Sequence, residues 1–75
     1  QNNFMTPLQQ LIYNYIKEHQ PICDLCISKG FEYDYNQYAN SICRQLEVLN
    51  QISRIKGKCP RCNRNVLLNS VIINA

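Results

Sequence analysis

Four cysteines in two Cys-x-x-Cys pairs are the residues of this sequence best suited to chemistry. The first pair is Cys23 and Cys26, and the second is Cys59 and Cys62. A turn with this spacing can direct both of its sulfurs at one ion, and two such turns fill the four tetrahedral positions of a closed structural Zn²⁺ site. The spacing therefore predicts one structural zinc ion bound by all four thiolates.

Three other arrangements could use these cysteines. A rubredoxin-like iron site would use the same four thiolates, because a tetrahedral thiolate set suits either metal. Disulfides require an oxidising compartment, but residues 1–5 have neither the basic nor the apolar region of a signal peptide. A redox-active pair is expected in an alternating strand and helix pattern, which is absent here. Zinc and a cytoplasmic, intracellular location are the predictions, with iron left open.

The length of the chain favours a metal-stabilised fold. A chain of 75 residues buries only about 60% of its unfolded surface, so one domain with a covalent or metal staple is expected. Residues 1–5 are predicted to be disordered or foreign to the native chain, and residues 6–75 to form a single zinc-stabilised domain. No apolar run approaches the 18 residues of a membrane span, so no membrane partner is predicted.

Basic residues are concentrated in the second half of the sequence. The formal net charge is +3, but four thiolates around one Zn²⁺ would lower it to about +1. No acidic residue follows Glu47, and only Lys17 and Lys29 precede the cluster of basic residues. The cluster consists of Arg44, Arg54, Lys56, Lys58, Arg61 and Arg64. The pattern predicts a local basic surface.

The first predicted helix covers residues 7–19. Thr6 is a suitable N-cap, Pro7 occupies the first helical position, and Gln9 can complete a capping box. Apolar residues then recur with the helical period. The single histidine, His19, is expected near the helix end as a surface group, since four cysteines already complete the metal site.

Two further helices are predicted. Residues 22–29 should form a short helix with the first cysteine pair on one face, ending at Gly30 in the left-handed conformation. Asp34 can cap a longer third helix, whose apolar positions are Tyr35, Tyr38, Ala39, Ile42, Leu46 and Leu49. Cys43 borders this stripe and is assigned to packing, with a ligand role in place of one of the four cysteines as the alternative. The opposite face has polar residues at Asn36, Gln37, Asn40, Arg44, Glu47 and Gln51.

The sequence pattern from Ile52 onward predicts a β-hairpin. From Ile52 the apolar pattern changes from helical to alternating. Residues 52–56 and 64–68 are predicted strands, and residues 57–62 form the turn that contains the second cysteine pair. Residues 70–75 could extend the second strand or pack against the first helix.

Helix, short helix, long helix and hairpin, in this order, resemble a zinc-stapled winged helix-turn-helix domain. The resemblance is strongest at residues 21–26, 42–47 and 57–62. It implies a small α+β fold with three helices followed by a two-stranded hairpin, closed by the four-cysteine structural zinc site. It also implies that the third helix enters the major groove and the hairpin contacts phosphates. The implied base contacts are Asn36, Gln37, Asn40 and Arg44, and the implied backbone contacts are Arg54, Lys56, Lys58, Arg61 and Arg64.

Two functions are therefore expected as alternatives. The first is a nucleic-acid-binding module for duplex DNA, in a transcription regulator or as an accessory domain of a DNA-acting protein. The second is a protein-protein interaction adaptor, using exposed aromatics such as Tyr13, Tyr33 and Tyr35. A single module buries only about 600–1,000 Å² on DNA, so a homodimer or further domains are expected. Enzyme activity is not predicted, because the sequence shows no acid and base pair and no activated nucleophile.

Overall fold

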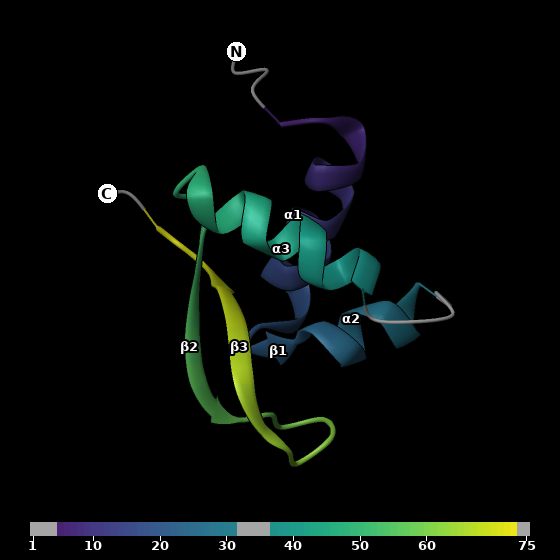
Figure 1. The fold of residues 1–75 in the computed structure, drawn as a ribbon, viewed down its shortest axis with the longest axis vertical. Coiled ribbons are helices and arrows are strands. Elements are labelled where there is room, and N and C mark those ends of the chain that lie inside the picture. The colour runs from purple at the N-terminus through teal and green to yellow at the C-terminus, as the bar shows by residue number, and fades with distance from the viewer. Residues whose placement is uncertain (1–4, 32–36, 74–75) are drawn as a thin grey trace.

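The computed structural model describes residues 5–31 and 37–73, and these ranges form three helices and a three-stranded antiparallel sheet (Figure 1). The small α+β class predicted from the sequence is confirmed. Residues 1–4, for which disorder was predicted, lie outside the described residues. The elements in chain order are α1 (Pro7–His19), β1 (Ile22–Cys23), α2 (Asp24–Gly30), α3 (Gln37–Val48), β2 (Ile52–Lys58) and β3 (Asn65–Val71).

Helix α1 begins and ends at the predicted residues. The Gln9 backbone amide donates to Thr6 Oγ1 over 3.1 Å, and Gln9 Oε1 accepts from the Thr6 amide over 2.9 Å. This capping box satisfies two donors that the first turn of a helix leaves unpaired. Ile12 and Ile16 are fully buried on the inner face. The local sequence therefore determines the start of α1, and burial of one face determines its orientation.

The predicted helix over residues 22–29 is wrong at its start. Ile22 and Cys23 form β1, which pairs antiparallel with Asn69 and Leu68 of β3, and α2 begins only at Asp24. The sheet is therefore three-stranded, in the order β1-β3-β2, where the sequence predicted a two-stranded hairpin. Pairing with β3 gives the backbone groups of these two residues partners that local sequence cannot reveal.

Gly30 also differs from its predicted role. It is the last residue of α2, and its φ is not positive. A Cβ at this position would overlap the Tyr15 ring. The glycine is therefore needed for the close approach of α1 to the end of α2, and not for a left-handed turn.

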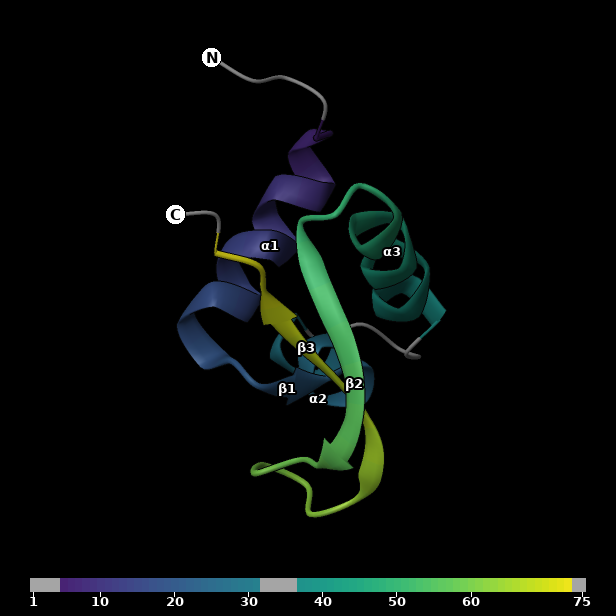
Figure 2. The same ribbon diagram turned by 90° about the vertical axis from the view of Figure 1, so that its left-hand side faces the viewer.

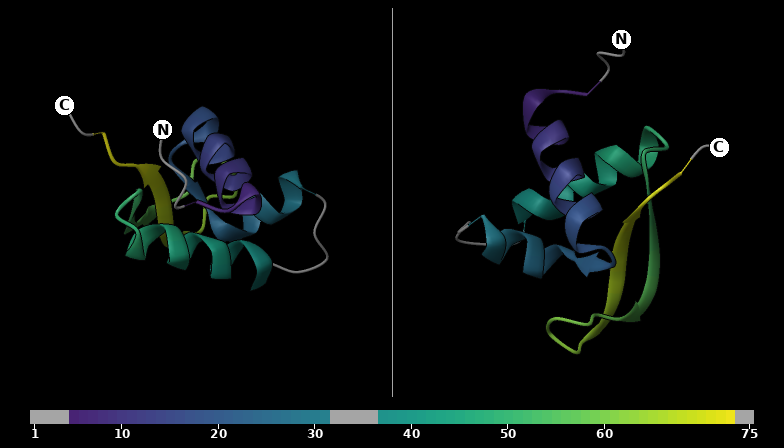
Figure 3. Two further views of the ribbon diagram at one scale, coloured as in Figure 1. Left: turned by 90° about the horizontal axis from the view of Figure 1, so that it is seen from above. Right: turned by 180° about the vertical axis from the view of Figure 1, so that it is seen from behind.

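Strands β2 and β3 form a regular hairpin from Ile52↔Val71 to Lys58↔Asn65. Both strands are longer than predicted, and β3 includes two of the residues, 70 and 71, whose structure the sequence left undecided. In Figure 1, and from behind in Figure 3, the helices lie to one side of the hairpin and its turn projects beyond them.

Helix α3 is described from Gln37, so the predicted cap at Asp34 lies outside the described residues. Its inner face buries Ala39, Ile42 and Leu46 against α1 and α2, and Cys43 is fully buried beside them, as the packing assignment predicted. Tyr38 departs from the predicted apolar stripe, since 56% of it is exposed. No helix in the described ranges is long and apolar enough to cross a membrane.

Candidate metal centre

The sulfurs of Cys23, Cys26, Cys59 and Cys62 all lie within 4.8 Å of one another. The Sγ atoms of Cys23 and Cys62 are 3.6 Å apart, and those of Cys26 and Cys59 are 3.8 Å apart. A tetrahedral thiolate site with metal–sulfur bonds of about 2.3 Å requires sulfur–sulfur edges of about 3.8 Å. The four cysteines predicted as ligands therefore form a cluster whose size fits one tetrahedral metal ion.

Two separate elements position the cysteines. Cys23 ends β1 and is the N-cap residue of α2, and Cys26 lies in the first turn of that helix. Cys59 and Cys62 lie in the turn between β2 and β3, which we call the knuckle turn (residues 59–64). Because β1 pairs with β3, the sheet brings the beginning of α2 beside the knuckle turn (Figure 2).

The knuckle turn is closed by its own backbone. The Cys59 amide donates to the Arg64 carbonyl over 2.9 Å, and the Asn63 amide donates to the Cys59 carbonyl over 2.8 Å. Asn63 has a φ of 62°, in the left-handed region that asparagine tolerates better than most residues. The turn therefore reverses the chain while both sulfurs point inward.

Hydrogen bonds and burial act on the thiols in opposite directions. Burial raises the pKa of both Cys23 and Cys26. Burial also acts to raise the pKa of Cys59, but backbone amide donors outweigh it and the pKa is lowered. The Arg64 amide and then its guanidinium lower the pKa of Cys62 to about 6. The knuckle side of the cluster thus favours thiolates, which are the form that binds metal.

All four positions of such a site would be protein sulfurs, which is the arrangement of structural and not of catalytic metal sites. Cys43 is outside the cluster. His19 also lies elsewhere: its ring is 4.2 Å from the Tyr15 ring, and its Nδ1 is 3.1 Å from Arg61 Nη2. The donor set fits zinc and equally fits iron.

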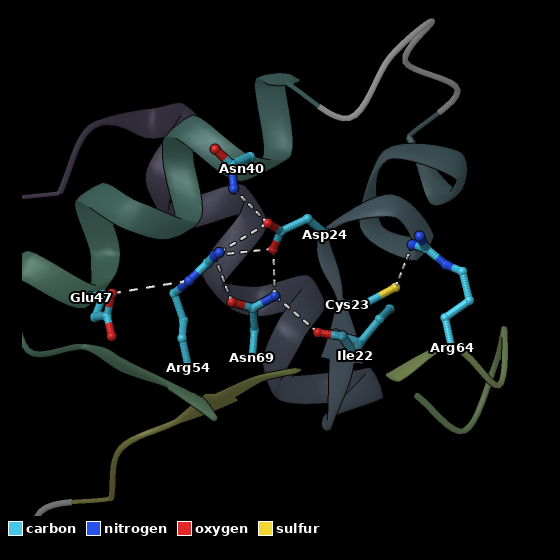
Figure 4. Close-up of polar contacts among 8 residues, drawn as sticks. All are labelled: Ile22, Cys23, Asp24, Asn40, Glu47, Arg54, Arg64 and Asn69. Atoms are coloured by element: carbon cyan, nitrogen blue, oxygen red, sulfur yellow. Dashed lines mark hydrogen bonds and ion pairs between the residues drawn. The ribbon is translucent and has the colours of Figure 1, made fainter. Parts of the chain in front are cut away.

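A second polar network adjoins the metal centre, and we call it the Asp24 cluster (Asp24, Asn40, Arg54 and Asn69; Figure 4). Asp24 accepts two hydrogen bonds from Arg54, both of 3.1 Å, one from Asn40 of 2.9 Å and one from Asn69 of 2.8 Å. Asn69 also bonds to Arg54 and to the Ile22 carbonyl. The cluster joins α2 and α3 to both strands of the hairpin.

Hydrogen bonds to the carboxylate decide the pKa of Asp24. Burial acts to raise the pKa of Asp24, but the hydrogen bonds from Arg54, Asn40 and Asn69 outweigh burial and lower it. The side chains of Arg54 and Asp24 are 4% and 12% exposed. A bidentate pair that is this well buried and hydrogen-bonded can hold both charges.

This network contains two of the predicted nucleic-acid contacts. Arg54 is buried because it shares the inner face of β2 with Ile52, two residues away. Asn40 lies on the flank of α3 that faces the hairpin, and its amide donates to Asp24. The Arg54 side chain, 4% exposed, is therefore held inside the molecule and away from the predicted phosphate contact, and the base contact of Asn40 stays a prediction.

Sequence reasoning missed Asp24 and Asn69 as structural residues. Each gave a signal that could have been used: an acid stands between two of the clustered cysteines, and an asparagine interrupts the apolar run of residues 66–73. A buried polar residue in such a place is expected to have a specific partner.

The remaining residues predicted to contact nucleic acid have the following places in the structure. Asn36 and the side chain of Gln37 lie outside the described residues. Arg44, on the outer face of α3, is exposed. The exposed basic residues of the hairpin and knuckle turn are Lys56, Lys58, Arg61 and Arg64.

Comparison of the chain with protein-family models and with curated proteins found no match.

Proposed function

We propose that this chain is a winged helix-turn-helix module that binds duplex DNA and is stabilised by a structural zinc ion. The observation that supports this most is the charge of the hairpin and knuckle turn. Lys56, Lys58 and Arg61 are exposed there, and residues 48–75 contain no acid. A surface with one sign of charge attracts a phosphate backbone.

The order of the elements supports the winged-helix assignment. α2 and α3 would be the helix-turn-helix pair, β2 and β3 the wing, and β1 the short strand that pairs with the wing. Fold alone does not determine function, so the charge of the wing and the outer face of α3 must support DNA binding.

The outer face of α3 can be defined from its buried face. Ala39, Ile42 and Leu46 face the core, so at 100° per residue the opposite side presents Ser41 and Arg44. Both are exposed. An arginine fork can bind guanine O6 and N7 together, and a serine hydroxyl can bond to several base edges. These residues take the place of Asn40 in the proposed contact with bases.

Zinc is proposed for the metal centre because four thiolates in a closed tetrahedron are its usual structural site in small domains. Iron would give the same geometry, and metal analysis of the purified protein separates the two. An iron-loaded protein would be coloured and one loaded with zinc colourless. Zinc at one equivalent per chain is expected.

The test of function is a titration of zinc-loaded protein with labelled mixed-sequence duplex DNA at two salt concentrations. Affinity should fall steeply with salt, and Lys58→Gln should weaken binding to every sequence and lower the salt slope by about 1. Lys17→Gln, which removes an exposed charge from α1, is the matched control and should change little. No binding at low salt would reject the proposal.

A protein-interaction adaptor is the second candidate. Of the tyrosines expected to support it, Tyr13 is half-buried and packs against the core, and Tyr33 and Tyr35 lie outside the described residues. Large apolar side chains are nevertheless exposed at Val48 and Ile55. If DNA binding is absent, these two residues are the ones to substitute in a search for a protein partner.

A further inference from the structure

Arg64 reaches from the knuckle turn to a cysteine of the other pair. Its Nη2 donates to Cys23 Sγ over 3.9 Å, and Figure 4 shows the guanidinium directed at that sulfur. Arg64 precedes the first residue of β3, whereas Cys23 ends β1. The contact therefore crosses between the two segments that supply the sulfurs.

The charge of a loaded centre explains why a cation is placed there. Four thiolates around a divalent ion have a net charge of about −2. Cys26 and Cys59 are buried, so part of that charge lies away from water, where it needs a hydrogen-bonded or charged partner. A guanidinium remains charged at any ordinary pH and offers five donors.

The neighbouring basic side chains are not directed at the cysteine sulfurs. Arg61 lies inside the same turn, between the two cysteines in sequence, but its guanidinium contacts His19 Nδ1 on α1. Lys58 directly precedes Cys59, and its side chain is exposed. Among the described cationic side chains, Arg64 is the one placed against the sulfurs.

We propose that Arg64 is the counter-cation of the four-cysteine metal centre, a positioning residue that strengthens metal binding through its hydrogen bond to Cys23 Sγ. This reassigns a residue that the sequence placed among the phosphate contacts. The inference rests on the proposal that the four cysteines hold a divalent metal ion. Groups that hydrogen-bond to metal ligands typically change metal affinity by about 10–100-fold.

The first experiment compares the zinc affinities of wild type, Arg64→Gln, Arg64→Lys and Arg61→Gln by competition with a chromophoric chelator. Arg64→Gln should bind zinc about 10–100-fold more weakly. Arg64→Lys keeps the charge but loses the planar fork, so it should lie between wild type and Arg64→Gln. Arg61→Gln removes a charge from the same turn but leaves the sulfurs alone, and it should stay close to wild type.

A second measurement separates this role from simple support of the fold. In the Co²⁺-loaded proteins, loss of a hydrogen bond to sulfur raises the energy of the thiolate electrons. The thiolate-to-metal charge-transfer band of Arg64→Gln should therefore move to longer wavelength, and that of Arg61→Gln should not move. A residue that only supported the turn would change affinity without this shift.

Several results would overturn the inference. One is an Arg64→Gln protein with wild-type zinc affinity and an unmoved charge-transfer band. Another is an equal loss of zinc affinity in Arg64→Gln and Arg61→Gln, which would indicate an effect of general surface charge. If Arg64→Gln does not fold with saturating zinc, Arg64→Lys decides: wild-type affinity and band in that variant would reject the role. A wild-type protein that bound no metal would instead reject the metal centre itself.

Discussion

Cys23 and Asp24 are neighbours in the chain, but their side chains join two different networks. The sulfur of Cys23 meets the knuckle turn, and the carboxylate of Asp24 meets Arg54, Asn40 and Asn69 in the middle of the molecule (Figure 4). Both networks tie the beginning of α2 to the hairpin. Their chemistry differs, because Asp24 is matched by one guanidinium, whereas four thiols share the single guanidinium of Arg64.

The Asp24 cluster is complete without any added group. A carboxylate faces a guanidinium, and two amides satisfy the remaining positions. The four-cysteine centre lacks such balance, since four ionised thiols would repel one another unless a cation lies between them. A short chain therefore combines a network stabilised by its own residues with one for which we propose a metal ion, and the two should respond differently to the same treatments.

Removal of the metal should have the largest effect on the stability of the fold. Structural zinc sites contribute about 10–16 kcal/mol at neutral pH, which equals the whole stability of a typical domain. With excess chelator, the far-UV circular dichroism of the protein should lose its helical signal and recover it when zinc is added. A chelated protein that kept the folded spectrum would show that the Asp24 cluster and the core suffice.

Asp24→Asn should have the next largest effect. It leaves the Arg54 guanidinium buried without its counter-charge, at a loss of about 3–5 kcal/mol in the free energy of unfolding. Urea unfolding of the zinc-saturated protein measures this loss.

Glu47→Gln is the control for that substitution, because Glu47 is half exposed and its oxygen is 4.0 Å from Arg54 Nε. A pair of this kind contributes less than about 1 kcal/mol. Equal losses in Asp24→Asn and Glu47→Gln would mean that the buried pair adds no specific stability.

Acid should act on the metal centre before it protonates Asp24. Without metal, Cys23 and Cys26 have a pKa above the ordinary 9.0, so metal binding at pH 7 displaces at least two protons. Zinc affinity should then fall about 100-fold for each unit that the pH falls. Chelator competition between pH 6.5 and 8 measures this slope, and a slope clearly below two protons would contradict it.

Asp24 titrates in a different pH range. Its folded pKa lies below the ordinary 3.8, so its contribution to stability is complete above pH 3.8 and is lost as the pH falls through the folded value. Because loss of the metal should itself unfold the protein, zinc release and unfolding should coincide during acidification, at a pH above the range in which Asp24 titrates. A protein that released zinc but stayed folded until the pH fell below 3.8 would contradict this order.

Substitutions that strain the backbone should have the smallest effect on stability. Asn63 has a φ of 62° in the knuckle turn and Asn50 has a φ of 61° after α3. A β-branched residue in this conformation costs about 1–3 kcal/mol, so Asn63→Val and Asn50→Val should both lower the melting temperature. Both should also weaken zinc binding, because binding is coupled to folding. Asn63→Gly should be close to neutral in both measurements, and an Asn63→Val protein with the wild-type melting temperature would contradict the prediction.

Local signals in the sequence were enough for α1, the two hairpin strands and the identity of the clustered cysteines. The capping box of Thr6 and Gln9 lies within one helical turn, and the strand alternation repeats every two residues. The Cys-x-x-Cys spacing places two sulfurs together without help from the rest of the fold. Each of these signals acts over a few residues, where backbone geometry alone restricts the outcome.

Only the tertiary structure decided β1, the Asp24 cluster and the contact of Arg64 with Cys23. Asp24 meets residues 16, 30 and 45 positions away in the sequence. Local periodicity cannot state which of two similar polar side chains turns inward, because that depends on whether a partner from a distant segment arrives at the same point. For this reason Arg54 and Asn40, which by type suited nucleic acid, hold the interior together, whereas Lys56 and Lys58 remain exposed.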